Sequence, residues 1–314
     1  MRYIYLLLFS FSLITANCFA KKEYGDVICG AYPISIYDFD FTHNSFKTTF
    51  YFWVLSKTGY DAGKNIEISN ATEYKVNFSD VGKVPGFDRD MVRYTATVIA
   101  DWNLTYFPFD SQTLVVNMED SIYMEDQVRF IADEKNSSLG RSFLADEWEL
   151  KKFHVKTDTH LYDTNFGDPS IKNSKYSRLK LIFHIKRLGE NLYLGLFLGF
   201  FIAFFLCLIA YMAPINSIDF RGDLMLGSIF ATIGNKYIIE QSIPRSTYVL
   251  LFDTLQIITF IVIMYTLFII IFCYKLYNLG KKEKAVFLNK ISAAGSSVFY
   301  IMGVFLFTYI AVVS

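Results

Sequence analysis

Hydrophobic and polar residues alternate one by one along several segments of the first 187 residues. Successive side chains of a β-strand point to opposite faces of the sheet, so this alternation predicts strands with one buried face. No helical periodicity of any length precedes Leu188. We therefore expect residues 21–187 to form an all-β sandwich. The alternating segments are 46–55 (FKTTFYFWVL), 93–100 (RYTATVIA), 113–119 (TLVVNME), 148–157 and 176–187.

The pattern changes after Leu188, where alternation gives way to continuous apolar runs. A helix needs about 20 apolar residues to cross a bilayer, and each run has about this length. The predicted fold class is therefore an all-β sandwich extracellular domain followed by a four-helix transmembrane bundle. The helices are expected at about 190–213, 221–243, 248–275 and 292–314, in a transmembrane domain that covers 188–314.

Residues 1–20 have the pattern of a secretory signal peptide. Arg2 precedes an apolar run, and small residues stand before Lys21. Cys18 lies in the cleavage zone, so the exported domain would keep only Cys29 and no internal disulfide. Lysines cluster between the third and fourth expected helices, which places that connection in the cytoplasm and the β domain outside. These lysines are Lys275, Lys281, Lys282, Lys284 and Lys290.

Composition narrows the function classes. Hydrophobic residues make up 53% of the chain and aromatic residues 18%, and the formal net charge is +0, so no nucleic-acid partner is expected. The four histidines are scattered, and no nucleophile, base and orienting acid follow one another in a recognisable order. We therefore predict a protein that is not an enzyme and that has no cofactor and no metal centre.

The segment WNLTYFPFDSQTL, residues 102–114, is predicted to be a loop. Pro108 donates no hydrogen bond to a neighbouring strand, which excludes a central strand. Phe107 and Phe109 on either side of it are large apolar rings that must be buried against another part of the protein.

With this loop, the chain resembles the pentameric ligand-gated ion channels of prokaryotic type, which are members of the Cys-loop receptor family without the cysteine pair. Four landmarks carry the resemblance over nearly the whole chain: FPFDSQ at 107–112, the basic pair Lys186 and Arg187, four membrane helices, and a second helix bracketed by Arg221 and Pro244. The cysteines that name the family would fall at Ala100 and Leu114.

The resemblance implies a homopentameric channel in the cell membrane, the inner membrane if the source is bacterial, with a multi-pass helical domain in contact with lipid. A small-molecule or ionic ligand would open it from the interface between neighbouring β domains. The second hypothesis is a membrane-anchored receptor that keeps the fold and does not conduct.

The resemblance also implies two sets of residues in the β domain. In the first, aromatic rings beside a carboxylate would bind an ammonium-type ligand. In the second, the rings of the 107–110 loop would dock on the 242–247 turn, while Asp110 and Asp40 would pair with Arg187. The ligand set is Phe130, Asp133, Tyr162, Phe166 and Tyr176, and the coupling set is Asp40, Phe107, Pro108, Phe109, Asp110, Arg187 and Pro244.

The second expected helix leaves two pore-lining stripes open. The family register predicts Asp223, Gly227, Phe230, Gly234, Tyr237 and Gln241, whereas polarity alone predicts Ser228, Thr232, Asn235 and Ser242. A third interpretation is that the polar atoms only hold helices together. Asp219 and Asp223 at the cytoplasmic mouth would favour cations, and Arg221 between them would act against this. In the first expected helix, Gly195 and Gly199 form a small-xxx-small pair that would allow close helix packing.

Overall fold

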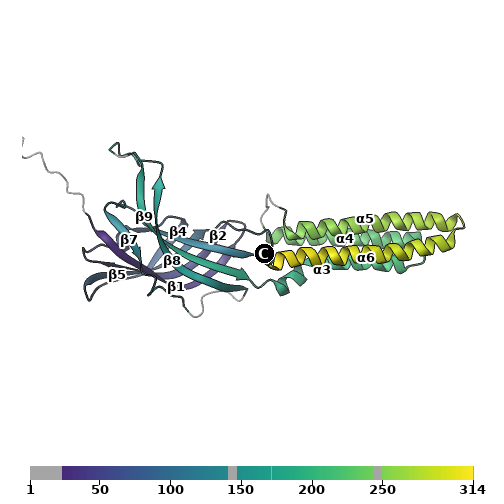
Figure 1. Ribbon diagram of the computed structural model, residues 1–314, viewed down its shortest axis with the longest axis horizontal. Helices are drawn as coiled ribbons and strands as arrows, with labels where there is room; N and C mark the ends of the chain where they lie inside the picture. Colours follow the sequence, from purple (N-terminus) through teal and green to yellow (C-terminus); the bar gives the residue numbers. More distant parts are fainter. Residues whose placement is uncertain (1–22, 141–146, 171, 244–248, 314) are drawn as a thin grey trace, which may run out of the picture.

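The computed structural model describes residues 23–140, 147–170, 172–243 and 249–313 of the chain. It divides into a strand-rich part and a bundle of long helices, which follow one another along the long axis (Figure 1). The last helix returns to the junction between the two parts. The expected signal peptide lies outside the described residues, as does Cys18.

The first sheet is mixed. Its strands are antiparallel to their neighbours except β1 and β7, which run parallel. The alternation seen in the sequence is real in β5, where every second residue from Asp90 to Val98 is buried. Across the sheet the strands are β4 (Ala71–Val84), β5 (Phe87–Ile99), β2 (Ser45–Ser56), β1 (Gly25–Asp40) and β7 (Val128–Ala132).

The second sheet is antiparallel throughout. Fully buried side chains from both sheets, among them Phe50, Phe52, Val116 and Phe183, form the core of the β domain. The hairpin of β8 and β9 extends away from the body of this domain (Figure 1). The strands in order are β3 (Ile66–Ile68), β6 (Ser111–Asp120), β9 (Ser174–Arg187) and β8 (Trp148–Tyr162), and the short helix α2 (Ala62–Asn65) precedes β3.

The helical part begins almost directly after β9. Helices α3 and α4 pack along each other, as do α5 and α6, and α5 also contacts α3 and α4. Because α3 starts at the junction and α6 ends there, the turns after α3 and after α5 lie at the far end of the bundle (Figure 1). The four helices are α3 (Glu190–Met212), α4 (Ile218–Ser242), α5 (Leu251–Asn278) and α6 (Lys282–Val313).

The predicted fold class is wrong as stated. In the described part of the chain three helices, α3, α5 and α6, are long and apolar enough to cross a membrane, not four. Helix α4 is excluded because charged and polar residues such as Asp223, Lys236 and Glu240 lower its hydropathy. The β domain also departs from an all-β sandwich, since the short helix α2 interrupts the strands.

Buried polar side chains hold α4 to its neighbours. Asn235 donates to the carbonyl of Leu196 at 2.8 Å and accepts from the amide of Gly199 at 3.1 Å, which joins α4 to α3. Arg221, fully buried at the far end, donates to the carbonyl of Ala210 at 2.7 Å and to the side chain of Asn289. The last carbonyls of α3 carry partial negative charge, so they partly compensate the buried guanidinium.

Candidate functional site

Three aromatic rings meet where the β8–β9 hairpin leaves the β domain. The ring centre of Tyr162, at the end of β8, lies 5.4 Å from that of Phe166 and 5.8 Å from that of Tyr176 on β9. The centres of Phe166 and Tyr176 are 6.3 Å apart, and all three pairs meet edge to face. The sequence predicted these three residues as a group.

The three rings line a cavity of about 590 Å³. Its other walls come from β3, the start of β4 and the end of β6, which contribute the carboxylates Glu67, Glu119 and Asp120 and the ring of Tyr74. Sequence reasoning missed these four residues. The two short segments that bring the carboxylates together, Ile66–Ile68 and the end of Ser111–Asp120, become neighbours only through the pairing of β3 with β6.

Two of the three carboxylates are already engaged. Glu119 is 1% exposed and accepts from Arg178 Nε at 2.6 Å and from the Tyr162 hydroxyl at 3.1 Å. Asp120 accepts from the hydroxyl of Tyr60 at 2.6 Å, and burial raises its pKa. These contacts fix the floor of the cavity.

Glu67 is the remaining carboxylate. It takes part in no ion pair among the described residues. Burial raises its pKa, and the nearby charges of Glu119 and Asp120 raise it further. A cation in the cavity would relieve this repulsion, and aromatic faces attract cations as well. The cavity therefore suits a small ammonium ion better than an anion.

The structure places the other two predicted ligand residues elsewhere. Phe130 is 2% exposed and belongs to the core between the sheets, while its amide donates to Ser177 Oγ. Asp133 accepts from the indole nitrogen of Trp53 at 3.2 Å and from the side chain of Asn136 at 2.8 Å. Neither residue lines the aromatic cavity, so within one chain the predicted five do not form one site.

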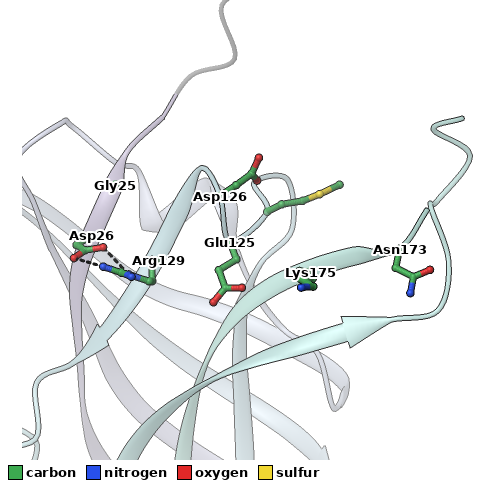
Figure 2. A pocket seen from close by; sticks show the side chains of 8 residues that line it. Gly25, Asp26, Glu125, Asp126, Arg129, Asn173 and Lys175 are labelled. Carbon is green, nitrogen blue, oxygen red and sulfur yellow. Dashed lines mark hydrogen bonds and ion pairs between the residues drawn. The ribbon is translucent and has the colours of Figure 1, made fainter. Parts of the chain in front are cut away.

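A second cavity, of about 530 Å³, lies at the start of β1 and β9. Figure 2 shows side chains around it from β1, from the loop before β7 and from the start of β9. Asp26 and Arg129 pair across part of it through two contacts of 2.8 Å. It lacks aromatic rings, which makes it the weaker candidate for an ammonium ligand. No group of three or more metal-ligating side chains occurs in the described ranges.

The predicted pair of Asp110 and Arg187 is present at the junction. Arg187 Nε lies 2.8 Å from Asp110 Oδ1 and Nη2 lies 3.3 Å from Oδ2, with side chains 4% and 1% exposed. The guanidinium also lies over the rings of Phe41, Phe107 and Trp148, at 4.8, 4.9 and 4.1 Å from their centres. One carboxylate and three aromatic faces thus surround the cation that ends β9.

The 107–110 loop is seated on the helices. Phe107 is 5% exposed and packs in one cluster with residues of α3 and α5, and the ring of Phe109 lies 5.4 Å from that of Tyr193 on α3. The carbonyl of Thr105 accepts from the amide of Leu251 at 3.1 Å. A β-carbon at Gly189 would come within 2.0 Å of the carbonyl oxygen of Pro108, so only glycine fits there.

Asp40 does not join this pair. Its carboxylate accepts from the backbone amides of Thr42 and His43, at 2.9 and 2.8 Å, and lies 2.7 Å from the imidazole of His43. The expected pairing with Arg187 is therefore wrong, because local hydrogen bonds of the β1–β2 turn hold the carboxylate. Pro244, with most of the 242–247 turn, lies outside the described residues.

Helix α4 separates the two predicted stripes onto opposite faces. Ser228 and Thr232 are fully buried inside the bundle and bond to the carbonyls of Leu224 and Ser228 one turn earlier, and Asn235 is buried with them. The side chain of Ser242 is not among those described. The family-register stripe faces outward, with Phe230 72% and Tyr237 64% exposed. Asp223, Gly234 and Gln241 are exposed too, whereas Gly227 is half-buried.

The charged residues at the start of α4 also separate. Asp219 and Asp223 are exposed, whereas Arg221 turns into the bundle. The two carboxylates therefore lie on the outer surface of this turn, and the guanidinium between them does not.

A comparison of the chain with models of protein families found no match, and neither did a comparison with curated proteins.

Proposed function

We propose that the protein is the subunit of a homopentameric, ligand-gated, cation-conducting channel of the cell membrane. A small ammonium compound would bind in the cavity of Tyr162, Phe166 and Tyr176, beside Glu67. The β domain would lie outside, and the lysine-rich far end of the helices would lie in the cytoplasm.

One observation carries this proposal: a single strand connects the cavity with the helices. β9 contributes Tyr176 to the cavity and Arg178 to the ion pair with Glu119 in its wall. The strand ends at Arg187 in the junction and is followed within three residues by α3. α3 in turn holds α4 through Asn235. A ligand that shifts one end of β9 has a continuous covalent and hydrogen-bonded path to α4, as coupling between two sites requires.

The surface of α4 supports the conducting version of the proposal. Its buried Ser228, Thr232 and Asn235 make their hydrogen bonds within one chain. The outward stripe of Asp223, Phe230, Tyr237 and Gln241 is therefore left for other copies or for water. Five copies would bring five such stripes to one axis, with Asp223 at the far end as a ring of carboxylates that favours cations.

Recording currents from the purified protein in planar bilayers, while small amines are added to the side of the β domain, tests the function. We expect unitary cation currents, together with five copies by native mass spectrometry in detergent. Asp223→Ala should lower the preference for cations over anions, and the matched change Ser228→Ala on the buried face should do less. A larger effect of Ser228→Ala than of Asp223→Ala would reject the family register, in which Asp223 faces the pore.

The alternative is a non-conducting receptor, and the glycines of α4 favour it. Gly234 has no heavy atom within 4 Å of where a β-carbon would stand, so the outward face has room for close contact between copies. Steady absence of unitary currents from confirmed pentamers that bind an amine would establish this alternative.

A further inference from the structure

A third cavity, of about 620 Å³, lies at the junction between the β domain and the helices. Its walls come from the start of β8, the end of β9, the first turn of α3 and the end of α6. Phe109 and Tyr193 contribute rings, and Val312 closes it from α6. This cavity shares no lining residue with the aromatic cavity of Tyr162, Phe166 and Tyr176 or with α4.

The cavity carries charges of both signs. Lys151 and Glu149 lie in it as an ion pair with 2.7 Å between Nζ and Oε2. Lys186 reaches only the carbonyl of Val312, at 3.4 Å, and Glu190 is exposed at the start of α3. Lys186 and Glu190 belong to no ion pair in the part of the chain that the structure describes, so an ammonium and a carboxylate there are available to a ligand.

The apolar surface next to the cavity belongs to helices that can cross a membrane. α3 and α6 both meet the length and hydropathy of a membrane span. Leu194 and Leu198 on α3 are 62% and 55% exposed, and Tyr309 and Val313 on α6 are 58% and 66% exposed. With hydrocarbon around these side chains, the cavity at the ends of both helices falls at the depth of the lipid headgroups.

We propose that this cavity binds the headgroup of a zwitterionic phospholipid whose cation is a primary ammonium, as in phosphatidylethanolamine. Its phosphate would bind Lys186 and Lys151, and its ammonium would bind Glu190 and Glu149 beside the ring of Tyr193. The acyl chains would lie along the exposed leucines of α3.

The charges of the cavity discriminate between headgroups. The ammonium of ethanolamine donates three hydrogen bonds to carboxylates, whereas the quaternary ammonium of choline donates none. An anionic glycerol headgroup would leave Glu190 without a cation and close to its own negative charge. Lipid binding at this cavity requires neither conduction nor an amine in the aromatic cavity.

The test uses the full-length protein in nanodiscs of phosphatidylcholine, alone or with one fifth phosphatidylethanolamine or phosphatidylglycerol. Native mass spectrometry counts the lipid that stays bound after mild activation. We expect ethanolamine lipid to be retained over both others, and Lys186→Gln and Glu190→Gln each to reduce this retention roughly tenfold, the effect of losing one charge-assisted contact.

The exposed pair Glu283 and Lys284 at the far end provides matched controls. Glu283→Gln and Lys284→Gln should leave the retention unchanged, and gel filtration of every variant shows whether it is folded. If Lys186→Gln fails to fold, Lys151→Gln takes its place. Preferential retention of phosphatidylglycerol, equal retention of all three lipids, or equal loss in the control variants would each overturn the proposal.

Discussion

At the scale of single residues, the junction depends on how the charge of Arg187 is balanced. Removing a guanidinium and a carboxylate from water costs several kcal/mol for each ion, and the two hydrogen bonds to Asp110 offset this cost only while both partners are present. The three aromatic rings around Arg187 add cation–π attraction that is stronger away from water. Loss of either partner leaves a buried charge without compensation, so the two residues must act as a unit.

A double-mutant cycle measures the coupling energy between Asp110 and Arg187. Asp110→Asn and Arg187→Gln should each lower the free energy of unfolding by about 3–5 kcal/mol, and the double variant should lose less than the sum. Thermal unfolding in detergent gives these values, and the amine concentration for half-maximal current should shift in each single variant. The gating role would be rejected by strict additivity in that second measurement.

Asp26 and Arg129 provide the matched control for this cycle. They form the same kind of bidentate pair, but their side chains are 54% and 57% exposed. Water and salt screen exposed pairs, so the cycle Asp26→Asn with Arg129→Gln should be close to additive. A coupling as large as that of Asp110 and Arg187 would show that burial is not the cause.

The pKa of Glu67 predicts how binding depends on pH. Burial, Glu119 and Asp120 raise this pKa, so the carboxylate takes up its proton at a higher pH than a free glutamate does. Below the raised pKa the negative charge is lost. The affinity for tetramethylammonium, which does not titrate, should therefore fall roughly tenfold as the pH decreases through that value.

Isothermal titration at a series of pH values checks this expectation. Glu67→Gln should bind weakly at every pH and lose the dependence, whereas Glu73→Gln, on the exposed strand β4 outside the cavity, should keep it. An affinity that rises on acidification would reject Glu67 as the group that faces the ligand.

How far the sequence predicts single contacts depends on their range. Asp110 and Arg187 could be matched because the loop and the end of the last strand are landmarks in their own right. Asp40 was misplaced because two backbone amides lie within three residues of it, and such local partners compete with distant ones. Glu67 could not be found, since nothing in Ile66–Ile68 marks it as a neighbour of Tyr162.

At the scale of elements, period-two alternation located most strands because one face of each is buried. The continuous apolar runs that marked the helices did not delimit α6, which begins at Lys282, earlier than the expected 292. Its first ten residues, KEKAVFLNKI, include three lysines and a glutamate, which favour a helix but interrupt any apolar run. The sequence showed which residues of α4 are polar. It did not show which of them face the inside of the bundle, because that depends on their partners in α3.

The contact of α3 with α4 leads to a prediction on glycine. A β-carbon at Gly199 would stand 2.5 Å from Cβ and 2.6 Å from Oδ1 of Asn235. Gly199→Ala should therefore force the helices apart and lower the free energy of unfolding by about 1–3 kcal/mol. Thermal unfolding in detergent is the measurement.

Gly195 is the control, one turn earlier on the same helix. No heavy atom lies within 4 Å of the place where a β-carbon at Gly195 would stand, so Gly195→Ala should be neutral or stabilising by up to about 1 kcal/mol. Equal destabilisation by both changes would mean that the loss at Gly199 does not come from the contact with Asn235.

At the scale of the whole molecule, exposed lysines lie at both ends of the long axis. Lys172 lies in the loop of the β8–β9 hairpin, whereas Lys284 lies in the first turn of α6 at the far end of the bundle. Helices α3, α5 and α6 between them have the length and hydropathy to cross a bilayer. Positively charged connections stay in the cytoplasm, so the far end should be inside and the hairpin outside.

Single cysteines test this orientation in intact cells. In a background where the four native cysteines are replaced by serine or alanine, Lys172→Cys should react with a membrane-impermeant maleimide, and Lys284→Cys should react only after the cells are opened. The two positions are matched because both replace an exposed lysine. Labelling of Lys284→Cys in sealed cells would show that the orientation is the opposite one. The aromatic cavity would then face the cytoplasm, where no external ligand could reach it.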